Sequence, residues 1–309
     1  MSEGFEQGQR ENAVALAGVG RSFGKTVALD GVDLRIPRGS VFGLLGLNGA
    51  GKTTLMRLLM GHVRPDVGTV NVLGKPVGQD LIGLRQRVGY VSQDRYLYDW
   101  MTVEEIMAFT RGLHTTWDED RAAALMKRFQ LPPDQTIKHL SAGVRARLCL
   151  ALVLSYRPEL LLLDEPTAGL DPQVRRDFLT QLIDEIVEEG TTVVFSTHLV
   201  HEVERVADTV GILHRGRLLV AGQTDELMND VRRIHCPYDG VGPDLSDLPG
   251  LLRRNIVRGE QALIVHQYSP LTIVDLEDRG VTDPHVLALS LEDVFLELTL
   301  AADEREGLR

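Results

Sequence analysis

At 309 residues, the chain exceeds one typical domain of roughly 100–200 residues, and a core of about 220 residues plus a smaller appendage would account for it. Hydrophobic residues make up 43% and charged residues 25%, an ordinary balance for a globular protein with a sizeable core. The formal net charge of −11 argues against coating nucleic acid by bulk positive charge, so no nucleic-acid partner is expected.

The two cysteines, Cys149 and Cys236, are isolated, which makes a disulfide framework or a zinc site an unfavourable interpretation. Cys149 lies in the apolar run 148–154 and is expected to be a small buried residue. The polar residues 1–12 predict a disordered lead-in without a secretory signal. Because no apolar run approaches the ~18 residues of a membrane helix, a cytosolic chain is expected, with any membrane part supplied by another chain.

In chain order, short strands separated by Gly and Pro come first, and helical patterns follow. Thr102 is a plausible N-cap for the first long helical stretch. Strands are expected at 15–19, 27–36, 41–45, 69–74, 160–163 and 192–196, helices at 54–60, 103–130, 141–156, 173–189 and 199–207, and a hairpin at 210–214 and 218–221. This alternation predicts an α/β core with a mainly parallel sheet.

After about residue 222 the character of the chain changes. Short runs at 262–267 and 271–277 look like strands, 237–244 is a turn cluster, and 291–300 has a helical pattern. We therefore expect a separate C-terminal α+β appendage.

The strongest local signal is the stretch from Gly46 to Thr54, GLNGAGKTT, which fits GxxxxGK[ST] with a strand before it and a helix after it. Its glycines allow successive backbone N–H groups to point at phosphate oxygens, and the helix that follows adds its positive end. Lys52 is expected to reach the β- and γ-phosphates of a nucleotide, and Thr53 to hold Mg²⁺. The alternative is a glycine-rich surface turn.

A second signal is LLLLDEP, residues 160–166, in which an apolar strand delivers two acids to its carboxyl end. That edge of an open α/β sheet is where ligands bind. Asp164 is expected to coordinate Mg²⁺, and Glu165 to orient or deprotonate the attacking water. Taken alone, the pair could be an exposed acidic turn.

A third motif, LSAGV at 140–144, opens a helix. Here the chain resembles the ATP-binding-cassette (ABC) family, whose signature is usually LSGGQ. Ser141 and Gly143 match that signature, whereas Ala142 and Val144 depart from it. The resemblance implies that Ser141 and Gly143 contact the γ-phosphate held by an opposite subunit. The alternative is simply an N-capped helix.

The resemblance spans residues 13–222 and gives further positions a role. It implies that Phe23 stacks on adenine, although a core Phe was an alternative, and that Gln93 senses Mg²⁺ and the attacking water. Asp171, in the loop that follows the acidic pair, would communicate across a dimer, and His198 would contact the γ-phosphate and Glu165. The remaining nucleotide contacts would come from the P-loop residues Asn48, Gly49, Ala50, Gly51, Lys52, Thr53 and Thr54.

By the resemblance, the fold is a P-loop NTPase with a RecA-like, mainly parallel sheet, an antiparallel β subdomain and a helical subdomain. The ATPase domain would occupy 13–222, with the helical subdomain at about 95–157, and the accessory domain would occupy 223–309. The cofactors implied are ATP and Mg²⁺. The working unit would be a homodimer or heterodimer that ATP closes.

Two stretches are similar to the ATPase subunits of bacterial ABC-2-type exporters, YDWMTVEE after Gln93 and SLEDVF from Ser290. The aromatic segment 94–101 is expected to receive a transmembrane permease subunit, unless its side chains pack within the helical subdomain. The chain would then lie on the inner face of the membrane as the energising subunit of an exporter. A soluble ABC ATPase that acts on another assembly and an importer subunit stay open alternatives.

Overall fold

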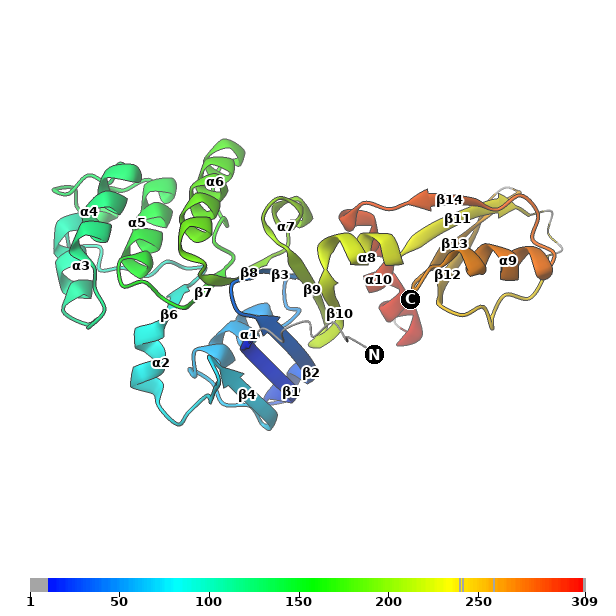
Figure 1. The fold of residues 1–309 in the computed structure, drawn as a ribbon, viewed down its shortest axis with the longest axis horizontal. Helices are drawn as coiled ribbons and strands as arrows, with labels where there is room; N and C mark the ends of the chain where they lie inside the picture. The colour runs from blue at the N-terminus through cyan, green and yellow to red at the C-terminus, as the bar shows by residue number, and fades with distance from the viewer. Residues whose placement is uncertain (1–10, 239, 241, 258, 308–309) are drawn as a thin grey trace, which may run out of the picture.

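The computed structural model describes residues 11–238, 240, 242–257 and 259–307 (Figure 1). The predicted lead-in therefore falls largely outside the described residues, as do two positions of the turn cluster at 237–244. Within the described part, no helix is both long enough and apolar enough to cross a membrane.

An antiparallel sheet in the order β2-β1-β4-β5 contains the N-terminal strands. Tight pairing of Phe23 with Thr26 joins the two long strands in a hairpin. The strands of this sheet are β1 (Asn12–Phe23), β2 (Thr26–Pro37), β4 (Val67–Val72) and β5 (Lys75–Pro76). The expected antiparallel subdomain is confirmed, with β1 and β2 longer than the pattern indicated.

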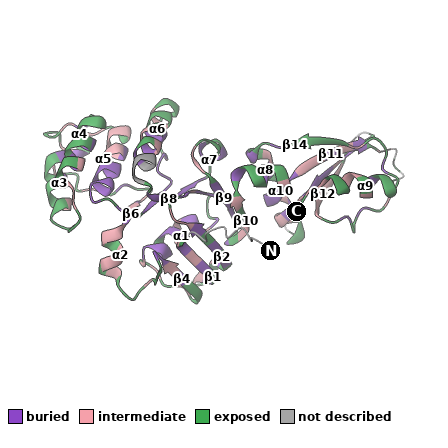
Figure 2. Ribbon diagram, in the orientation of Figure 1, coloured by how far each residue is buried: buried purple, intermediate pink, exposed green. Residues whose placement is uncertain are grey.

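The second sheet has the order β10-β9-β3-β8-β7-β6, and all its pairs except β9 with β10 are parallel. Two central strands are buried at every residue (Figure 2), as strands covered by helices on both faces require. The strands are β3 (Val41–Leu45), β6 (Val88–Val91), β7 (Leu160–Asp164), β8 (Thr192–Thr197), β9 (Thr209–His214) and β10 (Arg217–Gln223). The predicted mainly parallel α/β core is confirmed.

Helices α1 (Lys52–Leu59), α6 (Pro172–Glu189) and α7 (Val200–Val206) belong to this core. The helices at the far left of Figure 1 are α3 (Val103–Arg111), α4 (Glu119–Arg128) and α5 (Ala142–Leu154), with α2 (Leu81–Arg87) and the short 3₁₀ helix η1 (Ile137–His139) nearby in the chain. Thr102 caps α3 as predicted, because its hydroxyl accepts from Glu105 N while the Glu105 carboxylate accepts from Thr102 N. The helical patterns expected at 103–130 correspond to the two helices α3 and α4.

The accessory part lies at the opposite end of the molecule (Figure 1). Its sheet has the order β12-β13-β11-β14. The elements are α8 (Thr224–Asp230), β11 (Arg232–Pro237), β12 (Leu251–Val257), β13 (Glu260–Val265), α9 (Pro270–Asp278), β14 (His285–Ala288) and α10 (Leu291–Arg305).

The strand-like interpretation of 271–277 is wrong, because these residues belong to α9. Ser269 forms a capping box with Thr272, and Pro270 occupies the first helical position, where its fixed φ suits a helix. A short apolar run is compatible with either a strand or a helix. Packing against the accessory sheet decides between them here, because it buries Leu276 of the helix in the accessory core.

The accessory part is not packed only on itself. Apolar side chains of α10, among them Leu291, Phe295 and Leu298, belong to the same hydrophobic cluster as the ATPase helices, whereas Ile234 and Leu263 form a separate accessory core. The domain boundary between residues 222 and 223 stays a prediction. Helix α10 lies on the accessory side of this boundary and packs against the ATPase side.

Candidate functional site

The P-loop between β3 and α1 is shaped by its glycines. Gly49 and Gly51 have φ of 81° and 108°, in the region that side-chain-bearing residues rarely adopt. A Cβ on Gly46 would lie 2.5 Å from Leu213 O, and one on Gly51 would lie 2.4 Å from Ala28 O. The loop can therefore approach the neighbouring strands only with glycine at these positions.

Three predicted residues meet in one network. Lys52 Nζ donates to Gly46 O at 2.6 Å and lies 3.0 Å from Glu165 Oε1, and both side chains are almost fully buried. The other carboxylate oxygen of Glu165 lies 2.9 Å from His198 Nδ1. Because a carboxylate oxygen accepts hydrogen bonds, the imidazole Nδ1–H is assigned as the donor in this contact.

The acidic pair is held by β8. Ser196 Oγ donates to Asp164 Oδ1 at 2.7 Å and accepts from Glu165 N at 3.1 Å. Glu165 has a φ of 48°, an unfavourable value for a residue with a side chain, and such strain is characteristic of functional sites. Tyr90 on β6 adjoins the pair: burial, and after it the Asp164 charge, raises the pKa of its hydroxyl to about 12.

A cavity of about 370 Å³ opens in front of the P-loop. Every P-loop residue predicted to bind the nucleotide lines it, together with Gln93, Glu165 and the β2 residues Thr26, Val27 and Ala28. Of the predicted cation ligands, the Thr53 hydroxyl and the Gln93 amide line the cavity, whereas the Asp164 carboxylate is buried and does not line it. Oxygen donors of this kind fit Mg²⁺, which commonly takes one or two protein ligands and completes its shell with phosphates and water.

Phe23 is not a core residue. It ends β1, its side chain is 47% exposed, and the Arg21 guanidinium lies 4.7 Å from the ring centroid. It does not line the cavity, although Thr26 at the other side of the same hairpin does. The ring is therefore accessible for stacking at the rim, and the core alternative is excluded.

The signature residues lie elsewhere in the chain's own fold. Ser141 caps α5 by accepting from Val144 N at 3.3 Å, and a Cβ on Gly143 would lie 2.6 Å from Val174 Cγ1 on α6. Ser141 and Asp171 are exposed, and neither they nor Gly143 line the P-loop cavity. The helix cap that was the alternative for Ser141 is thus real, and it leaves the motif facing outward.

Sequence reasoning missed two buried residues that organise these loops. Arg95, in a left-handed conformation after Gln93, donates to Pro166 O at 2.6 Å and Ala168 O at 2.9 Å. Glu202 on α7 accepts from Thr167 Oγ1 and Thr197 Oγ1, both at 2.7 Å. Each is a charged side chain in a largely polar stretch of sequence, so only its distant partners explain its burial.

The aromatic segment 94–101 is open on its surface. Tyr96 and Trp100 are 84% and 70% exposed, and Tyr98 packs edge-on against Phe109 of α3 at 5.6 Å between ring centroids. Packing within the helices therefore applies to Tyr98, while Tyr96 and Trp100 remain available.

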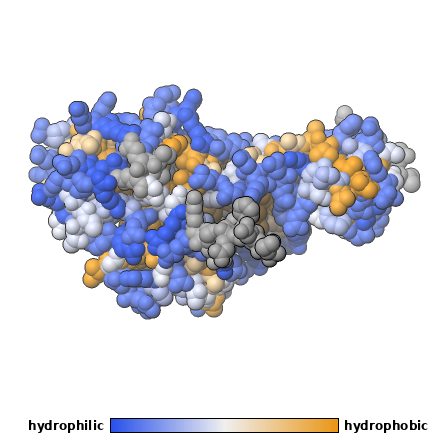
Figure 3. Space-filling view, in the orientation of Figure 1, coloured by the Kyte–Doolittle hydropathy of each residue, from blue (hydrophilic) through white to orange (hydrophobic). Residues whose placement is uncertain are grey.

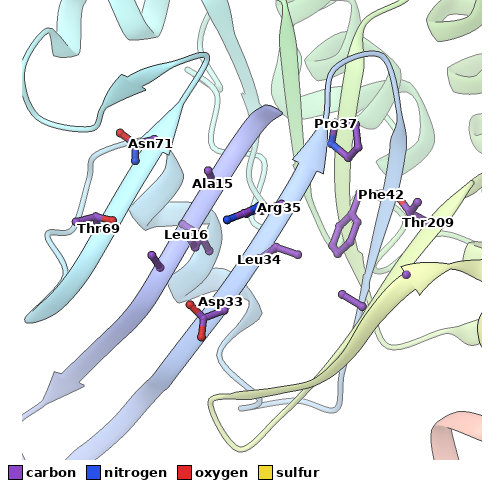
Figure 4. A pocket seen from close by; sticks show the side chains of 13 residues that line it. Ala15, Leu16, Asp33, Leu34, Arg35, Pro37, Phe42, Thr69, Asn71 and Thr209 are labelled. Carbon is purple, nitrogen blue, oxygen red and sulfur yellow. The ribbon is translucent and has the colours of Figure 1, made fainter. Parts of the chain in front are cut away.

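A larger hollow of about 750 Å³ lies between the antiparallel sheet and the β9–β10 hairpin (Figure 4). Its lining includes Asp33, Arg35 and Asn71 but none of the predicted site residues. The P-loop cavity, although smaller, is where the chemically matched side chains converge.

The sheet order and the P-loop at the carboxyl end of β3 define a P-loop NTPase. The family model for ABC transporters matches residues 29–168. Nod factor export ATP-binding protein I of Sinorhizobium fredii is 35% identical over 298 residues, which cover 93% of this chain and 86% of that protein. Daunorubicin resistance ATP-binding protein DrrA3 of Streptomyces coeruleorubidus is 37% identical over 305 residues, 94% of this chain and 96% of that protein.

Among solved structures, cbiO1 of Clostridium perfringens, part of an ABC transporter complex, shares the fold with a TM-score of 0.64 and 29% identity, over 72% of this chain and 92% of that one. A dimeric ATP-binding cassette with ADP and Pi bound matches with a TM-score of 0.61 at 24% identity, over 68% and 98%. The chain belongs to the ATP-binding subunits of ABC transporters, and the similarity to exporter ATPases is confirmed.

Proposed function

We propose that the chain hydrolyses Mg²⁺-bound ATP in the P-loop cavity and that Glu165 is the catalytic base. The observation that carries this is the contact of one carboxylate with both Lys52 and His198 at the cavity wall. Lys52 would hold the β- and γ-phosphates, Glu165 would accept the proton of the attacking water, and His198 would hold Glu165 in place through its Nδ1–H. Mg²⁺, held by Thr53, Asp164 and Gln93, would neutralise phosphate charge.

The outward-facing signature supports the proposal of a dimer, which would have two-fold symmetry if the two subunits are identical. Ser141 and Gly143 begin a helix, whose N-terminal N–H groups suit a phosphate, yet they do not line their own chain's cavity. A second subunit would bring its Ser141, Gly143 and Asp171 to the γ-phosphate. Bound ATP would then contact both subunits and stabilise the dimer. The same logic applies to a homodimer and to a heterodimer.

The motion is proposed to drive a membrane exporter from the inner face of the membrane. Two features support this: the exposed aromatic side chains Tyr96 and Trp100 suit helix-in-groove docking of a permease, and relatives are named for Nod factor export and daunorubicin resistance. A soluble ABC ATPase without a membrane partner is the alternative.

Substitution of the proposed base tests the chemistry. Glu165→Gln keeps the size of the side chain and a polar contact to Lys52 but cannot take a proton. We expect hydrolysis to fall by about 10²–10⁴-fold, with ATP binding retained and a dimer trapped by ATP on size exclusion. Hydrolysis at the wild-type rate would refute the assignment.

A pull-down of tagged Glu165→Gln protein from solubilised membranes, with ATP present, tests the transporter role. Recovery of a polytopic membrane protein is expected, and its loss when Trp100→Ser is added would locate the docking surface. Ile82→Ser is the matched control, since Ile82 is 80% exposed on α2, outside the aromatic segment. Recovery of soluble proteins only would favour the soluble ABC ATPase.

A further inference from the structure

The last turn of α10 contacts the turn between β9 and β10. Asp303 Oδ1 lies 2.8 Å from His214 Nε2 and 3.0 Å from Arg215 Nε. The side chains of His214 and Asp303 are only 9% and 13% exposed. The hydrogen bond from His214 is the main cause that lowers the pKa of Asp303, so the carboxylate stays ionised at this junction.

A second contact reinforces the first. Arg217, the first residue of β10, donates to Asp30 Oδ2 of β2 at 2.8 Å and to Glu306 Oε1 at 3.2 Å. One guanidinium thus links the end of α10 to β2. Because Arg217 is 58% exposed, this bridge is weaker than the Asp303 contact.

The β9–β10 turn is also a wall of the P-loop. Gly216 N donates to Ala50 O at 2.9 Å, and Gly216 O accepts from Asp30 N at 2.8 Å. Gly216 has a φ of 83°, and a Cβ there would lie 2.9 Å from Ala28 O. Ala50 and Ala28 both line the cavity, on the P-loop and on β2 respectively.

Asp303 is therefore separated from the cavity wall by a single, tightly fitted turn. Displacement of that turn would shift Ala50 on one side of the cavity and Ala28 on the other, because closely packed backbone transmits strain rather than absorbing it.

We propose that Asp303 is a positioning residue for nucleotide binding, through which the accessory domain sets the shape of the P-loop cavity. The proposal rests on the proposed function, in that this cavity takes ATP. By linkage, a nucleotide in the cavity would in turn hold the end of α10 in place.

The direct test is titration of the full-length chain with a fluorescent ATP analogue, without any membrane partner. For Asp303→Ala we expect the Kd to rise about threefold to tenfold with an unchanged number of binding sites. The matched control is Glu304→Ala: the neighbouring Glu304 of the same helix accepts from Arg253 of β12 at 2.9 Å, away from the turn. That variant should stay within about twofold of the wild type.

Lys52→Ala separates failure of this inference from failure of the proposed function. If Lys52→Ala binds the analogue like the wild type, the cavity is not the nucleotide site. If it loses binding while Asp303→Ala keeps the wild-type Kd, or if Glu304→Ala weakens binding equally, the positioning role of Asp303 is refuted.

Hydrogen exchange supplies an independent readout if Asp303→Ala folds poorly. In the wild type, ATP should slow amide exchange across residues 300–306, and Lys52→Ala should abolish the effect. Asp303→Asn, which keeps the shape of the side chain, should reduce the protection. Unchanged exchange in the wild type on ATP binding would overturn the proposal.

Discussion

Replacement of Arg95 by Met should uncouple the loop after β6 from the loop after the acidic pair. Arg95 is 8% exposed and donates to Pro166 O and Ala168 O. The two hydrogen bonds from a charged donor contribute roughly 3 kcal/mol or more. Burial of the guanidinium, which also lowers the pKa of Arg95, offsets part of this gain.

We expect Arg95→Met to lower the free energy of unfolding by about 1–3 kcal/mol, since two carbonyl oxygens lose their partner. The kcat for ATP hydrolysis should fall about tenfold if the loss of these hydrogen bonds raises the activation free energy by about 1.4 kcal/mol. Urea unfolding followed by tryptophan fluorescence and a phosphate-release assay measure the two quantities.

The matched control is Arg111→Met. Arg111 forms an ion pair with Glu119, and its side chain is 62% exposed, so its loss should cost less than about 1 kcal/mol. If Arg95→Met is as stable as the control and hydrolyses ATP within twofold of the wild-type rate, the reasoning about the buried guanidinium is refuted.

Two further predictions concern the site and the pH dependence. Ser196→Ala removes the hydroxyl that bonds both Asp164 and Glu165, so kcat should fall about tenfold to a hundredfold while the fold persists, measured by phosphate release and circular dichroism. His114 stacks on Tyr156, and burial lowers its pKa below the usual 6.5. The unfolded chain therefore binds more protons near that pH, and stability falls as pH drops below about 6.5. In urea unfolding, His114→Phe should show a shallower loss of stability between pH 7 and 5 than the wild type.

Clear results would contradict each of these. An unchanged kcat in Ser196→Ala, with Thr180→Ala on the exposed side of α6 as the control, would show that the acids hold their positions without the hydroxyl. Parallel stability curves for His114→Phe and the wild type would show that His114 does not contribute to the pH dependence.

The apolar patch around α9 illustrates a limit of pattern reading. Leu271 and Val274 are 74% and 50% exposed, and Figure 3 shows apolar surface at this end of the molecule. The short apolar run at 271–277 resembles a strand, yet the segment is a helix in which only Leu276 is buried. The local pattern was compatible with both structures, and packing against the accessory sheet decided between them.

The sequence by itself determined the parts of the site that are local. The P-loop follows from glycines that permit positive φ and from the helix that begins at Lys52, and these are properties of consecutive residues. The same holds for the strand at 160–164, whose apolar residues bury it and deliver Asp164 and Glu165 to its end.

Only the tertiary structure decided which distant residues hold those groups in place. Arg95 meets Pro166 across 71 positions of the chain, and Asp303 meets His214 across 89. Neither has a local signal, because a lone charged residue is compatible with a solvated surface until the fold buries it beside a partner. Local backbone conformation depends on neighbouring residues, whereas the pairing of buried charges depends on which distant segments the sheets and helices bring together.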